Sequence, residues 1–261
     1  METTPVHALV CGGCAGFAVD VSLYPIDTIK TRLQAPQGFF KAGGFAGIYR
    51  GISVAAAGSV PGAALFFSVY ESAKRGDHPA HHMAAASVGE IAACLVRVPV
   101  EVVKQRMQAG HYSSMSQGAR RILRSDGVAG FFRGYGMTVL REIPFAMLQM
   151  PLLEFMKRKW ADYQGSEPSP PQVAVCGSIA GGVAAAATTP LDVVKTRLML
   201  GADLAGVRYD QGILECAHRI ATHEGPPAFF SGVSARVFWI SLGGFIFFGA
   251  YDASQKLLPS I

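Results

Sequence analysis

Long apolar stretches alternate with short clusters of charged residues along the whole chain. Two of the stretches, residues 51–70 and 168–191, contain no Asp, Glu, Lys or Arg. Each is about as long as the roughly 20 residues that a helix needs to cross a bilayer. Four other apolar stretches contain isolated charges, which are costly in a membrane unless they face water or a partner. The pattern therefore predicts membrane helices around a water-lined interior.

An octapeptide of one design occurs three times. Each copy has a proline, an acid two residues later, a base three beyond that and a second base two further on, at residues 25–32, 99–106 and 190–197. An aromatic–glycine element and a second apolar stretch with an acidic end follow every copy. Such periodicity indicates internal repeats. We expect three repeats, residues 1–76, 77–165 and 166–261, which form one structural domain with two membrane helices per repeat.

Composition agrees with a membrane protein. The chain is 50% hydrophobic and 16% charged, whereas soluble domains average about 25% charged. A soluble helical array, the competing interpretation, needs more charge on its exposed faces. The formal net charge is +5, and bases at helix ends and in linkers favour contact with anionic lipid head groups. The absence of a long basic run interleaved with aromatics argues against nucleic acid, and we expect neither a signal peptide nor a cleavable presequence.

The sequence contains no recognisable catalytic or metal-binding constellation. Cys11 and Cys14 have metal or redox spacing, but they lie in an apolar glycine-rich stretch without a second pair. We expect them to be packing residues, and we expect His81 and His82 to be a solvated helix end. The sequence therefore predicts no enzyme activity, no cofactor and no metal.

The three octapeptides, the aromatic–glycine elements and the acidic helix ends together resemble the mitochondrial carrier family. The resemblance covers essentially the whole chain. It implies an all-α, multi-pass protein of the inner mitochondrial membrane, with six transmembrane helices in three pseudo-threefold repeats, short matrix helices and a central cavity. We expect it to act as a monomer.

Within this family, five segments are similar to members that carry S-adenosylmethionine: residues 28–34, 96–99, 101–106, 140–145 and 240–247. The resemblance implies import of S-adenosylmethionine into the matrix, normally in exchange for S-adenosylhomocysteine. Another cationic amino-acid-like or adenine-containing solute is the alternative.

The octapeptides are candidates for a gate on the matrix side. Their prolines should kink the odd helices, and each acid lies on the same helix face as the base three residues later. The family pattern implies the ion pairs Asp27–Lys104, Glu101–Lys195 and Asp192–Lys30, braced by Gln34 and Gln108. Each acid could instead pair within its own helix. A ring of weak ion pairs would make a gate that substrate binding can open.

The acidic ends of the even helices are candidates for a second gate, on the cytoplasmic side. The family pattern implies that Glu71 pairs with Lys157 and Asp252 with Lys74, whereas Glu154 would face the neutral Gln255. Tyr70 and Tyr251 could brace this ring. Ordinary solvated helix ends are the alternative interpretation.

Substrate recognition should use positions that break the threefold pattern. The resemblance implies contact points at Gly58, Arg141 and Trp239, with Glu142 adjoining the second. The odd helices contribute two unmatched carboxylates, Asp20 and Glu90, and an acid inside a membrane indicates function by default. Arg236 lies one turn nearer the matrix gate, where it could couple substrate to that gate.

These residue types match the chemistry of S-adenosylmethionine. The acids could complement its sulfonium and ammonium, and an arginine could hold its carboxylate in fork geometry. Trp239 could stack on the adenine or face the sulfonium. Two alternatives remain: the acids pair structurally with Arg97, Arg141 or Arg236, and Trp239 only packs.

The aromatic–glycine elements begin the even helices, where free N–H groups and the helix dipole favour phosphate. The resemblance implies that cardiolipin binds there, at Arg50, Gly51, Arg133, Gly134 and Gly232. A turn that only caps each helix is the alternative.

Overall fold

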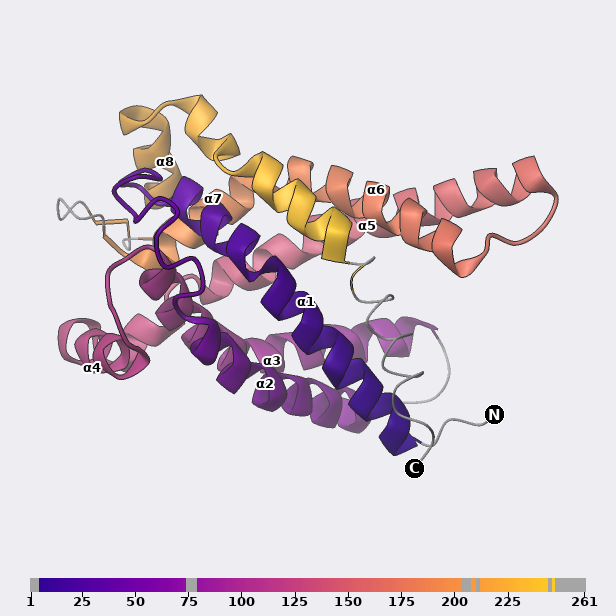
Figure 1. Ribbon diagram of the computed structural model, residues 1–261, viewed down its shortest axis with the longest axis horizontal. Coiled ribbons are helices and arrows are strands. Elements are labelled where there is room, and N and C mark those ends of the chain that lie inside the picture. The colour runs from indigo at the N-terminus through magenta and orange to yellow at the C-terminus, as the bar shows by residue number, and fades with distance from the viewer. Residues whose placement is uncertain (1–4, 74–78, 203–207, 210–211, 244–245, 247–261) are drawn as a thin grey trace. The chain divides into compact units, whose positions relative to one another are not determined.

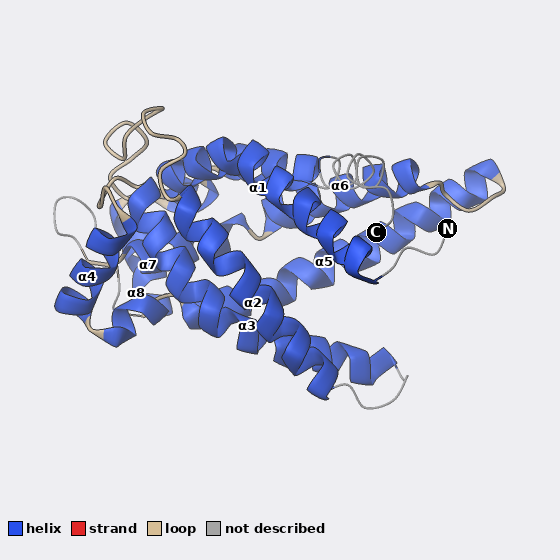
Figure 2. Ribbon diagram, turned by 60° about the horizontal axis from the view of Figure 1, so that its bottom comes forward, coloured by secondary structure: helices blue, strands red, loops and turns tan. Residues whose placement is uncertain are grey.

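A computed structural model describes residues 5–73, 79–202, 208–209, 212–243 and 246. The described part of the chain is helical and contains no β-strand, as Figure 2 shows. The one extended feature is an isolated bridge between Ala202 and Arg208. The predicted all-α class is confirmed.

Long helices account for the predicted membrane segments. They are α1 (Pro5–Gln34), α2 (Ile52–Ala73), α3 (Pro79–Gln108), α5 (Tyr135–Gln164), α6 (Pro170–Ala187) and α7 (Thr189–Leu200), followed by a helical segment at residues 233–243. Pro25 and Pro99 lie inside α1 and α3. Pro190 instead lies in the first turn of α7, after a break at Thr188, where proline is tolerated because its missing N–H would have no partner within the helix. By length and composition, α6 is the one helix of the described residues that qualifies as a membrane span.

The linkers differ between the repeats. The second and third contain the helices α4 (Met115–Asp126) and α8 (Ile213–His223), followed by the 3₁₀ turns η1 (Val128–Phe132) and η2 (Pro226–Phe230). The first, residues 35–51, is made of turns and contains no helix. Its glycines at positions 38, 43, 44 and 47 have φ between 54° and 114°. This left-handed backbone cannot continue a right-handed helix, so the expected short helix is missing there.

The chain divides into two compact units. The first comprises residues 1–30, 144–189 and 232–261, and the second comprises residues 31–143 and 190–231. In the second unit, α2 and α3 run side by side (Figure 1) around a buried cluster that includes Val54, Val98 and Val102. In the first unit, small residues bring α6 close to the helix at 233–243. A Cβ on Gly181 would lie 2.9 Å from Ile240 Cγ2, so glycine is needed for this close approach.

Candidate functional site

One of the three predicted gate pairs lies wholly within the second unit. Lys195 Nζ of α7 lies 2.7 Å from Glu101 Oε1 of α3, and their side chains are 6% and 22% exposed. Gln105 Nε2 donates to the same carboxylate oxygen at 2.9 Å. The ion pair therefore joins two odd helices in a largely buried place, with an amide support that the sequence analysis did not anticipate.

The two bracing glutamines also join odd helices. Gln34 Nε2 donates to Asp192 Oδ2 at 3.0 Å, and Thr196 Oγ1 donates to Gln34 Oε1 at 2.7 Å. Gln108 Oε1 accepts from Thr31 Oγ1 at 3.0 Å. Both glutamine side chains are buried, so each is held in a fixed orientation between two helices.

The other two gate pairings stay predictions. Asp27 and Lys30 belong to the first unit, whereas their expected partners Lys104 and Asp192 belong to the second.

The arginine that ends each octapeptide has contacts that were not predicted. Arg32, Arg106 and Arg197 are all at most 3% exposed. Arg32 Nε donates to the carbonyl of Gln108 at 2.8 Å, and Arg106 Nε donates to the carbonyl of Met199 at 2.9 Å. Arg32 and Arg106 thus connect the ends of consecutive odd helices.

Acids of the linkers hold two of these arginines. Glu224 accepts both Nη groups of Arg197, at 2.6 and 2.7 Å, and Asp126 accepts Arg106 Nη1 at 3.3 Å. The first repeat has Gly43 at the corresponding position, and Arg32 Nη1 donates to the carbonyls of Gly44 and Ala46 instead. The Asp-Gly and Glu-Gly pairs at residues 126–127 and 224–225 were the signal that could have revealed these contacts.

Arg141 of α5 lies between two acids of the second unit. It forms an ion pair with its neighbour Glu142 on α5. Its Nε lies 3.8 Å from Asp192 Oδ1, and its side chain is 16% exposed. A predicted substrate residue therefore lies beside a predicted gate acid.

Glu90 is paired inside its own helix. Arg97 of α3 forms an ion pair with it, and the Arg97 Nη2 to Glu90 Oε2 distance is 3.5 Å. This is the structural pairing that the sequence analysis kept as the alternative. The Glu90 side chain is still 28% exposed, so the carboxylate is accessible to a ligand.

Two predicted substrate residues have packing roles in this structure. A Cβ on Gly58 would lie 2.5 Å from Val100 Cγ1 of α3, so the space beside this predicted contact point is filled by Val100. Arg236 is 2% exposed, and its Nη2 donates to Thr188 Oγ1 at 2.9 Å. It therefore stabilises the end of α6 and is not open to solute. Trp239 is half-buried in the first unit, and the side chain of Asp20 lies outside the described residues.

The described part of the cytoplasmic gate consists of contacts within single helices. Lys157 Nζ lies 2.9 Å from Glu154 Oε1, three residues earlier on α5. The ring of Tyr70 stacks on Phe66 with centroids 6.0 Å apart. The Glu71 side chain and Lys74, Tyr251, Asp252 and Gln255 lie outside the described residues, so the pairings across this gate stay predictions.

A small pocket adjoins the second aromatic–glycine element. Its volume is about 180 Å³, and Arg133, Gly134, Gly212 and Ile213 are among its lining residues. Gly134 has φ 79° immediately before α5, and this backbone presents the first N–H groups of a helix, which favour phosphate.

The described residues contain no cluster of metal ligands. Cys94, Cys176 and Cys216 are buried free thiols. Burial raises the pKa of the Cys216 thiol to about 12, which keeps it protonated and unreactive at neutral pH.

Comparisons with known proteins extend these observations. The family model described as mitochondrial carrier protein matches residues 2–76, 75–164 and 166–261. The mitochondrial S-adenosylmethionine carrier protein of Xenopus laevis is 53% identical over 258 residues, which cover 96% of this chain and 97% of that protein. The corresponding Mus musculus protein is 52% identical, with 97% and 95% covered. The putative mitochondrial carrier protein PET8 of Saccharomyces cerevisiae is 47% identical, with 96% and 94% covered.

Repeats of one helical design, with odd helices joined by the Glu101–Lys195 ion pair and by buried glutamines, fit the class of membrane carriers. The chain belongs to the mitochondrial carrier family. It is a multi-pass protein of the inner mitochondrial membrane, and it is a transporter and not an enzyme.

Proposed function

We propose that this protein imports S-adenosylmethionine into the mitochondrial matrix in exchange for S-adenosylhomocysteine. The observation that carries this proposal is about 50% identity, over nearly the full length, to proteins named as S-adenosylmethionine carriers. Transport proceeds by alternating access, in which the matrix and cytoplasmic gates open in turn. The cavity surface that meets the substrate includes Arg141 and Glu142.

Arg141 supports a link between binding and gating. Its guanidinium contacts Glu142 and lies near Asp192. The carboxylate of an entering substrate competes for this guanidinium, because planar fork geometry suits a carboxylate. The electrostatic interaction between Arg141 and Asp192 then changes. The matrix gate opens when binding favours the open state by enough free energy.

The acids serve the cationic part of the substrate. S-Adenosylmethionine carries a sulfonium and an ammonium, and Glu142 and the partly exposed Glu90 offer carboxylates to them. Trp239 of the first unit offers a π face to the adenine or the sulfonium. Cardiolipin binds at the aromatic–glycine elements, where Arg133 and Gly134 line a pocket.

Ligand-induced stabilisation of purified protein tests the substrate class. A ligand that binds only the folded state raises the unfolding temperature. We expect S-adenosylmethionine and S-adenosylhomocysteine to raise it, and adenosine and lysine to leave it unchanged at equal concentration and ionic strength. A rise with lysine or adenosine alone would favour the alternative of another cationic or adenine-containing solute.

A further inference from the structure

A basic pocket in the second unit has none of the proposed substrate residues in its described lining. It has a volume of about 330 Å³ and is formed by the end of α3, by α4 and by the segment that follows α7. Its described lining includes Arg106, Arg121, Arg133 and Arg208 but only one acid, Asp126. The lining therefore has a formal excess of three positive charges with His111 neutral, which favours a polyvalent anion.

A buried, unsatisfied donor points to a ligand in this pocket. Arg106 has a side chain that is 3% exposed, and its Nη2 has no hydrogen-bond partner in the described part of the chain. A buried polar atom of this kind is costly unless something satisfies it. Asp126 does not do so, because it accepts Nη1 of Arg106 and Nη1 of Arg133.

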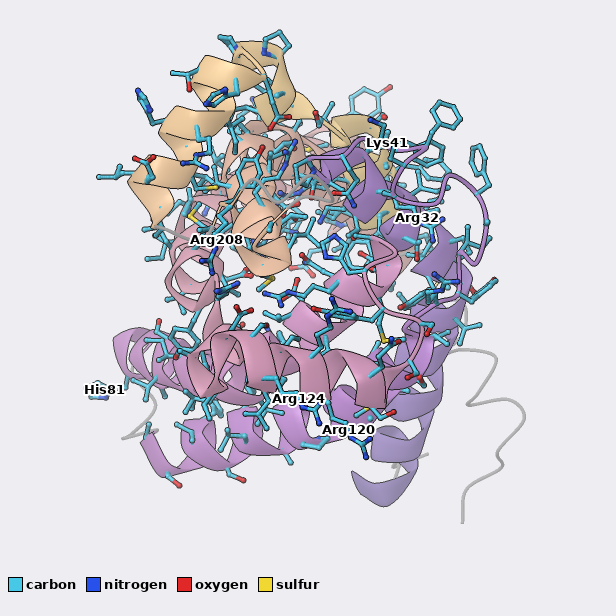
Figure 3. The ribbon with its side chains drawn as sticks, turned by 90° about the vertical axis from the view of Figure 1, so that its left-hand side faces the viewer. Arg32, Lys41, His81, Arg120, Arg124 and Arg208 are labelled. Atoms are coloured by element: carbon cyan, nitrogen blue, oxygen red, sulfur yellow. The ribbon has the colours of Figure 1, made fainter. Side chains whose placement is uncertain are left out.

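Glycine at position 201 lets two of these guanidinium groups approach the backbone closely. A Cβ on Gly201 would lie 2.6 Å from Arg133 Nη1 and 3.0 Å from Arg106 Nη2. Gly201 has φ 79°, so glycine suits both the backbone and the space here. Arg208 is attached to α8 because its carbonyl accepts from Arg219 Nη1 at 2.7 Å. Figure 3 labels Arg208 on the segment between α7 and α8, and Arg120 and Arg124 on α4.

We propose that this pocket binds a phosphate-bearing ligand, through Arg106 Nη2 with Arg121, Arg133 and Arg208. Guanidinium groups bind phosphate through paired charge-assisted hydrogen bonds. The hydroxyl of Tyr112, which also lines the pocket, adds a neutral donor. The site shares only Arg133 with the pocket beside Gly134. Its ligand is a soluble phosphate compound or the head group of a phospholipid, since the recognised chemistry is the same.

The double variant Arg121→Gln/Arg208→Gln tests the site, and Arg120→Gln/Arg124→Gln is the matched control. The control removes the same charge from α4 outside this pocket. The thermal unfolding midpoint of the purified full chain is measured against inorganic pyrophosphate and, separately, against cardiolipin, at constant ionic strength. Each lost arginine should weaken binding about tenfold.

Pyrophosphate should raise the midpoint of the parent and the control but not of the pocket variant. The same pattern with cardiolipin alone would support the pocket with a lipid head group as its ligand. Two results would overturn the proposal. In the first, the parent does not respond to pyrophosphate, and the pocket variant keeps the response to cardiolipin. In the second, the pocket variant and the control respond equally to both probes.

Discussion

At the scale of single residues, Arg141 is the side chain whose environment most directly joins recognition to gating. It contacts Glu142 and lies 3.8 Å from Asp192, while Gln34 holds the other oxygen of Asp192 at 3.0 Å. We therefore propose that a substrate carboxylate at Arg141 acts on a gate acid through one guanidinium. This is a short physical connection, and a change in a single residue can test it.

Replacing Arg141 by Lys keeps the charge and removes the planar fork. Loss of one charge-assisted hydrogen bond corresponds to roughly 1.5–3 kcal/mol, or about ten- to a hundredfold in affinity. We expect weaker binding of S-adenosylmethionine with an unchanged unfolding temperature, measured by titration of purified protein. Arg158→Lys, at an exposed position on the same helix, is the control. Unchanged affinity in Arg141→Lys would remove Arg141 from the site.

At the scale of helices, the ends of the odd helices are held by side chains that cross between them. Lys195 of α7 pairs with Glu101 of α3, and Arg106 of α3 donates to the carbonyl of Met199 on α7. The first contact is an ion pair that can exchange partners, whereas the second is to backbone. We therefore propose that gating depends on the ion pair more than on the carbonyl contact.

A charge swap tests whether Glu101 and Lys195 act as a pair. Glu101→Lys leaves a second buried cation beside Lys195, and breaking a buried pair typically costs about 3–5 kcal/mol. Transport should fall strongly in the single variant and return in part in Glu101→Lys/Lys195→Glu, as measured by uptake in proteoliposomes. Equal loss in the single and double variants would contradict the pairing.

The linker helix α8 depends on a second ion pair. Glu224→Gln weakens the bidentate contact to Arg197, which is 2% exposed. Because Glu224 is itself 26% exposed, we expect a loss of about 1–3 kcal/mol and a midpoint lower by several degrees. Glu215→Gln removes an exposed i,i+4 contact of 3.8 Å to Arg219 and should change stability by less than about 1 kcal/mol. Similar midpoints for the two variants would show that the Arg197 contact is not stabilising.

The sequence predicted those features that follow from periodicity. The helical class came from the apolar stretches and the octapeptides were found by their threefold repetition, whereas the pairing of Glu101 with Lys195 was implied by the resemblance to the carrier family. A backbone carbonyl is present in every residue and leaves no mark in the sequence. The contacts of Arg32 and Arg106 with backbone carbonyls could therefore not be predicted. The same limit applies to Gly58 and Arg236, whose packing against Val100 and Thr188 depends on how the helices approach each other.

At the scale of the whole molecule, the three matched segments cover almost the entire chain. Each segment contributes an octapeptide, an aromatic–glycine element and an acidic helix end. Four residues instead have no counterpart of the same type in the other two repeats: Asp20, Glu90, Arg141 and Trp239. A repeated framework with unrepeated polar positions suits a carrier, because gates can be symmetric while a solute such as S-adenosylmethionine is not. Solute transport is therefore the property that tests the whole account.

The most direct measurement is uptake of labelled S-adenosylmethionine into proteoliposomes that contain the purified protein. The vesicles are preloaded with S-adenosylhomocysteine, with S-adenosylmethionine, with lysine or with buffer alone. The account predicts rapid uptake with either adenosyl compound inside, and little with lysine or buffer. No uptake above protein-free vesicles with any internal solute, from protein whose cooperative unfolding shows that it is folded, would contradict it.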